Sequence, residues 1–171
     1  MTTAPPELAH LKTHLQEVRD LGSMGAVLSW DQSTYMPPGG APARARQMSL
    51  IGGLAHQKAT DPQLGKLLDA LEPYAESLPT DHDDAALIRV ARYDYDQSTK
   101  IPQALIAEFY GHTAASYQAW TVARPANDFA TMQPYLEKTL DLSRKLAECF
   151  PYEHIADPLI DNADRGMKAE T

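Results

Sequence analysis

The densest group of side chains that could do chemistry lies in the run Leu-Ser-Trp-Asp-Gln-Ser-Thr-Tyr-Met-Pro-Pro-Gly-Gly, near the N-terminus. Within six residues, Trp30, Asp31, Gln32 and Tyr35 bring together an indole, a carboxylate, an amide and a phenol. In a helical protein Trp30 and Tyr35 are expected to anchor the core, because large aromatic rings bury much apolar area.

Asp31 lies beside the apolar stripe of a predicted helix, so a covered carboxylate here needs a partner. Arg44 and Arg46, just past the Pro-Pro-Gly-Gly break, are both natural ion-pair candidates. Buried polar groups near turns usually satisfy backbone or salt-bridge needs. We therefore interpret the stretch as a helix corner in preference to a ligand site, and assign no catalytic role to its residues.

Two histidines have the spacing of zinc ligands on a helix. His10 and His14 are four residues apart, but Leu11 stands where a metallopeptidase helix carries its general base Glu. No third ligand is indicated nearby, and a zinc site needs at least three protein ligands. The pair is predicted to lie on a solvated helical face.

Three aspartates, at positions 81, 83 and 84, lack the alternating ligands and the Gly of a calcium loop. They suit the positive end of a helix dipole better than a metal site. The single cysteine, Cys149, lies in an apolar helical context and is interpreted as a small core or half-buried residue. The sequence thus predicts no catalytic and no metal-binding residue in this chain.

The composition is that of a soluble globular protein, with 43% hydrophobic and 22% charged residues in 171. The length favours one domain, residues 1–171. A net charge of −8 argues against a nucleic-acid partner, which would require a basic surface. No apolar run is long enough for a membrane span or a signal peptide, and a single cysteine fits a reducing compartment, so we expect a cytoplasmic protein.

Apolar residues recur at three- and four-residue spacing throughout, and no strand-like alternation persists. We therefore predict an all-α fold of about six or seven helices in antiparallel hairpins. Gly22 and Gly25 are expected to mark close approach of another helix. The first helix is predicted to start after Pro5-Pro6 and to run to about Tyr35, and the second to start near Ala41. The third is capped by Thr60 and ends near Pro73, the fourth is capped by Thr80, the fifth is opened by Ile101-Pro102 and the sixth is capped by Asn127.

Several of these motifs together resemble the carboxypeptidase Taq family of zinc metallocarboxypeptidases, over nearly the whole chain. The resemblance corresponds to about the N-terminal third of a family member. The matching positions are Leu28 to Ala41 with Ala43-Arg44, His56, Thr60-Asp61-Pro62, Ile101-Pro102 with Leu105 and Glu108, Trp120, Ala123-Arg124, Asn127-Asp128-Phe129, Pro134, Leu136 and the segment from Tyr152 to Met167.

The resemblance implies a larger helical peptidase with a deep groove, a divalent metal (usually zinc) and a homodimer. It implies removal of C-terminal amino acids from peptides, with a metal-activated water and a Glu base. In the family these groups sit in a downstream H-E-x-x-H helix, with a Glu ligand beyond it. No position here matches them, so this chain alone is expected to bind no metal and to be inactive. Trp30, Asp31, Gln32, Tyr35 and Arg44 are expected to shape one wall of the groove.

A second interpretation is a stand-alone helical binding or regulatory module that retains the peptidase scaffold. Under the first interpretation, helices that pack against the rest of a family member expose apolar faces here. We therefore expect exposed apolar surface and self-association.

Overall fold

The computed structural model describes residues 4–170 and contains six long α-helices, one short α-helix and one 3-10 turn, with no strand in that range. The all-α prediction is confirmed. No helix within residues 4–170 has the length and apolar character needed to cross a bilayer. The elements are α1 (Pro6–Thr34), η1 (Pro38–Gly40), α2 (Ala41–Ala59), α3 (Pro62–Glu76), α4 (Asp83–Ser98), α5 (Gln103–Ala126), α6 (Phe129–Ala147) and α7 (Asp157–Asp161).

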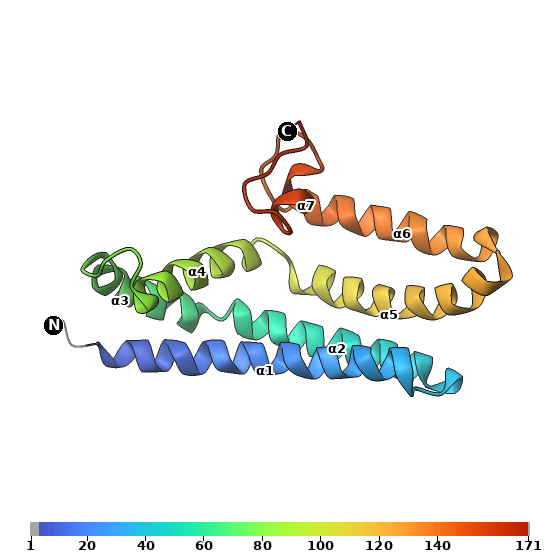
Figure 1. Cartoon of the computed structure of the whole chain (residues 1–171), viewed down its shortest axis with the longest axis horizontal. Helices are drawn as coiled ribbons and strands as arrows, with labels where there is room; N and C mark the ends of the chain where they lie inside the picture. The colour runs from blue at the N-terminus through green and yellow to red at the C-terminus, as the bar shows by residue number, and fades with distance from the viewer. Residues whose placement is uncertain (1–3, 171) are drawn as a thin grey trace.

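Three antiparallel hairpins are formed by α1 with α2, α3 with α4 and α5 with α6 (Figure 1). α1 and α2 lie along one long edge, and α3 and α4 form a second hairpin near the start of α1. α5 packs along α2, and α6 runs back along the other side of α5. The segment that contains α7 then returns toward the end of α4. The molecule is elongated because α1, with 29 residues, spans about 44 Å.

The first corner follows the predicted boundaries. α1 ends at Thr34, where the sequence predicted an end near Tyr35, and η1 and α2 follow the two prolines directly. Pro37 disfavours helical angles at the preceding residue and so ends the helix. Pro42 lies in the first turn of α2, where its missing N–H costs nothing.

The predicted cap of α3 is wrong by one residue. Asp61 is the N-cap, and its carboxylate accepts a hydrogen bond of 2.8 Å from the Gln63 amide. Thr60 instead closes α2, with its hydroxyl on the His56 carbonyl. The predicted end of α3 near Pro73 is also displaced. The helix continues to Glu76, with Pro73 in its last turn.

The predicted cap of α4 is also wrong. Thr80 lies in the preceding turn, and the helix begins at Asp83 with His82 as its N-cap. The Nδ1 atom of His82 accepts a hydrogen bond from the Asp84 amide at 3.2 Å. Asp83 and Asp84 occupy the first turn, as the dipole argument predicted.

The junction of α5 and α6 differs from the prediction as well. Asn127 does not cap α6; it terminates α5 in the left-handed conformation, with φ of 55°. Asp128 is the N-cap of α6, and its Oδ1 atom accepts from the Thr131 amide at 3.1 Å. Asparagine tolerates the left-handed region better than most residues, which suits it to a helix C-terminus.

The main cluster of buried side chains lies at one end of the molecule, where α1, α3 and α4 meet. Large aliphatic side chains fill it, whereas the α5–α6 end buries mostly alanines. The cluster comprises Leu8, Leu11, Leu64, Leu68, Leu71, Ile88 and Ala91. The molecule therefore has a conventional core at this end and closer, small-residue helix packing elsewhere.

The predicted close approach at Gly22 and Gly25 is wrong. A Cβ at Gly22 would meet nothing within 4 Å, and one at Gly25 would make an ordinary contact of 3.7 Å with Ile51. The close approach is at Gly52 in α2, where a Cβ would overlap the Tyr110 ring of α5. The glycine at position 52 therefore sets the separation of α2 and α5.

Candidate functional site

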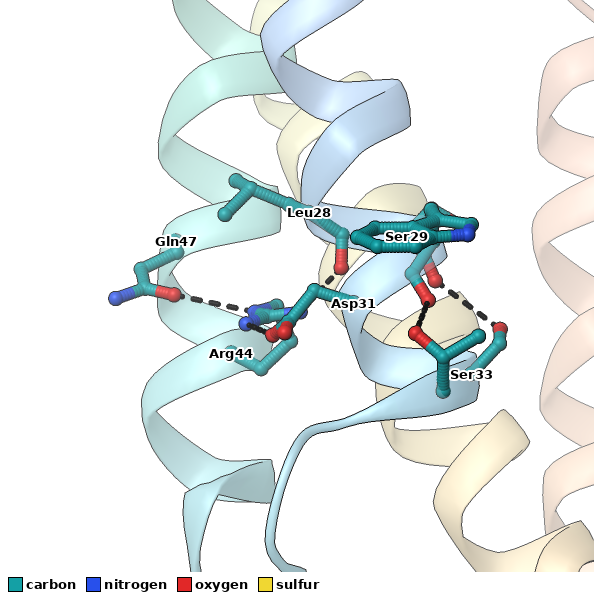
Figure 2. A network of polar contacts seen from close by, with 8 residues as sticks. Leu28, Ser29, Asp31, Ser33, Arg44 and Gln47 are labelled. Carbon is teal, nitrogen blue, oxygen red and sulfur yellow. Dashed lines mark hydrogen bonds and ion pairs between the residues drawn. The ribbon is translucent and has the colours of Figure 1, made fainter.

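The corner between α1 and α2 is held by the side chain of Arg44, which is only 8% exposed (Figure 2). Its Nη2 atom donates to Asp31 Oδ2 at 2.5 Å, and its Nη1 atom donates to the Leu28 carbonyl. Its Nε atom donates to Gln47 Oε1 at 3.2 Å. The predicted ion pair is confirmed, with Arg44 as the partner. Arg46 is exposed, and its guanidinium bonds the carbonyl of its own first helical turn.

Gln32 ties the corner to α5. Its Nε2 atom donates to the Ala114 carbonyl at 3.0 Å, across 82 residues of sequence. Beside it, the hydroxyls of Ser33 and Thr34 donate to carbonyls four residues back, so they add no contact beyond α1. One end of α1 is thus fixed to two other helices by two consecutive residues, Asp31 and Gln32.

The aromatic residues of the corner do not lie in the core, which corrects the sequence prediction. Trp30 is 58% exposed and Tyr35 is 75% exposed. Their rings contact each other edge to face, with centroids 5.4 Å apart and planes at 66°. The helical period explains the exposure of Trp30. Leu28 and Asp31 lie on the side of α1 that faces the buried Arg44 side chain, and Trp30 points away from that side.

The corner offers structural contacts and a display of aromatic surface, but no catalytic arrangement. Every polar group of Arg44 donates to a protein acceptor, and Asp31 already accepts from Arg44. No nucleophile lies within hydrogen-bonding distance of Asp31 in the part of the chain described. Of the five residues singled out in the sequence, two form the ion pair, one bonds to α5 and two form the exposed aromatic pair.

The two helical histidines have different environments, which partly corrects the prediction of a solvated face. His10 is exposed, but His14 is buried at 9% exposure, and its Nε2 atom donates to the Lys58 carbonyl at 2.8 Å. Lys58 Nζ also lies 2.6 Å from Glu17 Oε2, and this ion pair lowers the pKa of the Glu17 carboxyl. His14 therefore connects α1 to the end of α2.

The aspartates at the start of α4 do not gather around a common point. Asp84 accepts from Lys12 Nζ at 2.8 Å and from the Tyr74 hydroxyl at 3.3 Å, which joins α1, α3 and α4. Lys12 lowers the pKa of Asp84, while burial and the Asp84 charge raise the pKa of Tyr74. Across residues 4–170 there is no group of three or more His, Cys, Asp or Glu side chains that could hold a metal ion. The residues described therefore do not fit a zinc centre.

The α5–α6 hairpin contains a histidine contact that the sequence did not indicate. His112 Nε2 lies 2.8 Å from Thr139 Oγ1, and that hydroxyl donates its only proton to the Tyr135 carbonyl at 2.8 Å. The ring nitrogen must therefore be the donor. Burial, followed by the charge of Lys138, lowers the pKa of His112, so the neutral ring joins the two helices at pH 7.

A shallow cavity of about 570 Å³ lies along the line where α2 and α5 meet. Small and apolar side chains form most of its lining, with Arg46 and Gln103 at its edge. The one hydroxyl among them, Ser49 Oγ, already donates to the Ala107 carbonyl at 2.9 Å. The lining offers no pairing of nucleophile and base.

Residues 10–171 match the carboxypeptidase Taq (M32) metallopeptidase family, and the chain belongs to that family. Thermostable carboxypeptidase 1 of Thermus thermophilus is 32% identical over 176 aligned residues, which cover 96% of this chain and 34% of the relative. Carboxypeptidase 1 of Bacillus subtilis is 25% identical, over 90% of this chain and 30% of the relative.

Solved structures show the same helical arrangement. The M32 carboxypeptidase of Deinococcus radiodurans is 48% identical and superimposes with a TM-score of 0.71, over 97% of this chain and 33% of that one. The crystal structure called BsuCP superimposes with a TM-score of 0.91 at 23% identity, a likeness that concerns the fold alone. The chain spans about a third of the length of the relatives it matches.

Proposed function

We propose that this chain forms the N-terminal helical part of a metallocarboxypeptidase that releases C-terminal amino acids from peptides. The observation that supports the proposal is the family match over residues 10–171, combined with coverage of only a third of each relative. The rest of the enzyme would supply the H-E-x-x-H helix, the metal (zinc or another divalent ion) and the Glu base. When bound there, the metal would polarise the scissile carbonyl and activate a water.

The part played by the present residues is architectural. The Arg44 contacts fix the angle between α1 and α2, and Gln32 fixes α1 against α5. A wall built this way holds its shape while a peptide binds, which matters because small misplacements of a substrate reduce rates strongly. Trp30 and Tyr35 would contribute exposed aromatic surface to that wall. The enzyme would act in the cytoplasm.

The decisive experiment compares the 171-residue chain with the same chain extended by its own downstream coding sequence. With zinc or cobalt added, the extended protein should release C-terminal residues from a benzoylated dipeptide, and the 171-residue chain should not. Release by the short chain would refute the claim that its residues cannot act alone. Failure of an extended protein that contains H-E-x-x-H would refute the assignment of activity to the whole.

A second candidate function is a stand-alone binding or regulatory module that self-associates. Exposed apolar side chains on the helices support a binding role, because such side chains can associate with a partner. The exposed set on the helices includes Met24, Val27, Trp30, Leu50, Leu54, Val90, Tyr110, Trp120, Val122, Phe129, Leu136 and Leu140.

The gene sequence beyond Thr171 separates the candidates, and sedimentation tests the self-association that both predict. A stop codon directly after Thr171 in the gene supports the module, and an open frame that continues into H-E-x-x-H supports the enzyme. Sedimentation velocity of the 171-residue chain should show a dimer or larger species, because unpaired apolar faces associate in water. A strictly monomeric chain at micromolar concentration would contradict the self-association.

A further inference from the structure

The segment after α6 returns to α4 and is fixed there by one carboxylate. The Tyr93 hydroxyl, on α4, donates to Asp161 Oδ2 at 2.9 Å across 68 residues of sequence. The Gly166 amide donates to the other oxygen, Asp161 Oδ1, at 2.7 Å. The Arg165 guanidinium lies over the Tyr93 ring, 3.4 Å from its centroid. Asp161 therefore links the segment both to itself and to α4.

A second carboxylate, that of Asp157, accepts hydrogen bonds from backbone amides of the same segment. Asp157 is only 4% exposed and accepts from the His154 amide at 3.1 Å and the Ala169 amide at 2.9 Å. Lys168 Nζ lies 3.9 Å away. Two aspartates four residues apart thus fold residues 157–169 into a compact loop, which contacts Tyr93 of α4 through Asp161 and Arg165.

The position of this loop in the chain gives it a mechanical consequence. α6 packs on α5, and α5 packs mainly on α2, while the Gln32 hydrogen bond to Ala114 and the Lys100 ammonium over the Phe150 ring add smaller contacts. The contact between Tyr93 and Asp161 joins the far end of the hairpin to α4 (Figure 1). A hairpin held along α2 and at its far end keeps one angle, whereas a hairpin held mainly along α2 can swing.

We propose that residues 157–169 are a strap that holds the α5–α6 hairpin against α4, and that the strap is released when the contact between Asp161 and Tyr93 breaks. The cavity of about 710 Å³ beside the strap is lined by Asp94 and Lys100 from α4 and the loop that follows it, and by Lys168 from the strap. These charges, with Arg165 and Asp157, are the ionisable groups that line the described cavity around Asp161 and Tyr93.

The strap is expected to open in acid. Hydrogen bonds from the Gly166 amide and the Tyr93 hydroxyl lower the pKa of the Asp161 carboxyl. A carboxyl whose pKa is lowered on folding contributes fully above its unfolded value, and the contribution is lost as the pH falls through the folded value. The contact between Asp161 and Tyr93 is therefore intact at neutral pH. It begins to weaken below the unfolded value of about 4 and is lost as the pH falls through the lower folded value.

Trypsin measures opening directly, because Arg165 and Lys168 are cleavage sites within the strap. Asp161→Asn and Tyr93→Phe should each speed cleavage after Arg165 by about tenfold, since each weakens a hydrogen bond to a charged group. Matched controls are Asp164→Asn and Tyr152→Phe, two exposed residues whose side chains make no hydrogen bond within residues 4–170. The controls should cleave at the wild-type rate. Equal rates in all four variants would contradict the claim that the contact between Asp161 and Tyr93 holds the strap closed.

A distance measurement tests whether the strap governs the hairpin. Spin labels at Val90→Cys on α4 and Leu140→Cys on α6, both exposed positions, are introduced with Cys149→Ser. The distance distribution should be narrow with Asp161 present and should broaden in Asp161→Asn. An unchanged distribution in Asp161→Asn would show that the strap orders only itself, and would overturn its role in holding the hairpin.

Discussion

A guanidinium that is 8% exposed must find hydrogen-bond acceptors inside the protein, and Arg44 finds them on two helices. Its planar group serves a carboxylate and a backbone carbonyl at once, which the single ammonium of a lysine cannot match in geometry. The Leu28 carbonyl lies in the last turns of α1, so the arginine also covers one of the acceptors near the helix end.

Asp31→Ala should lower the free energy of unfolding by about 2 kcal/mol, because it leaves a buried guanidinium without its counter-ion. Arg44→Lys should cost a similar amount, since lysine loses the bonds to Leu28 and Gln47. The control is Asp141→Ala, which breaks the exposed ion pair with Arg144 and should change stability by less than about 0.5 kcal/mol. Urea unfolding measures all three, and equal losses at Asp31 and Asp141 would contradict the structural role of the corner.

The sequence predicted the ion pair because a carboxylate beside an apolar stripe has few alternatives to an arginine across the turn. It did not predict the exposure of Trp30 and Tyr35. Hydrophobicity indicates which residues gain from burial, but the neighbouring helices decide which positions of a face are covered. At this corner α2 and α5 cover Asp31 and Gln32 more than the aromatic rings.

At the scale of helices, the spacing of α2 and α5 depends on one glycine. Gly52→Ala should destabilise the protein by about 2 kcal/mol, because its Cβ overlaps the Tyr110 ring. Gly22→Ala, in a helix and facing open space, should stabilise it by about 1 kcal/mol through helix propensity. Thermal unfolding of the two variants gives opposite shifts. A stabilising Gly52→Ala would show that α5 can move away without cost.

The turn between α5 and α6 depends on the left-handed residue at position 127. Asn127→Ala should destabilise the protein by about 1 kcal/mol, since alanine pays the steric cost of positive φ. Asn127→Gly should be neutral or stabilising, because glycine adopts this conformation freely. Chemical denaturation compares the two, and an alanine variant as stable as the glycine variant would rule out this account of the turn.

Helix number and type followed from the sequence, whereas three of the predicted caps were displaced by one or two residues. Each cap lies in a run with several competent residues, such as Thr60-Asp61 or Asn127-Asp128. A hydroxyl and a carboxylate both cap well, so local chemistry favours neither. The choice depends on where the preceding helix ends, and packing with distant segments sets that point.

At the scale of the whole molecule, the acid sensitivity of the fold should begin at His112. Its lowered pKa means that folding favours the neutral ring, so stability is lost as the pH falls below about 6.5, the unfolded value. His112→Gln, which cannot titrate but can still donate to Thr139, should flatten the stability profile between pH 6.5 and the onset of carboxyl protonation near pH about 4.5. Denaturation midpoints of the wild type and His112→Gln, measured across this pH range, test the prediction.

The family and the helical class were accessible from the sequence because they rest on many positions, including the Trp30–Gly40 run and the segment near Gly166. The strap could not be predicted from the sequence, although its residues belong to that matching segment. Tyr93 lies in a different helix 68 residues away. Neither periodicity nor spacing connects two such positions, since the contact exists only after two hairpins have packed.

The contact between Tyr93 and Asp161 also has a consequence for the order of folding. It closes a loop that contains all of α5 and α6, and the entropy cost of closing a chain grows with its length. The α5–α6 hairpin involves shorter separations and forms more readily, after which less free chain remains to be closed. We therefore expect the strap to be the last contact to form during refolding and the first to break in the native protein. In native-state hydrogen exchange, the amides of residues 157–169 should exchange faster than those of the leucine cluster of α1, α3 and α4.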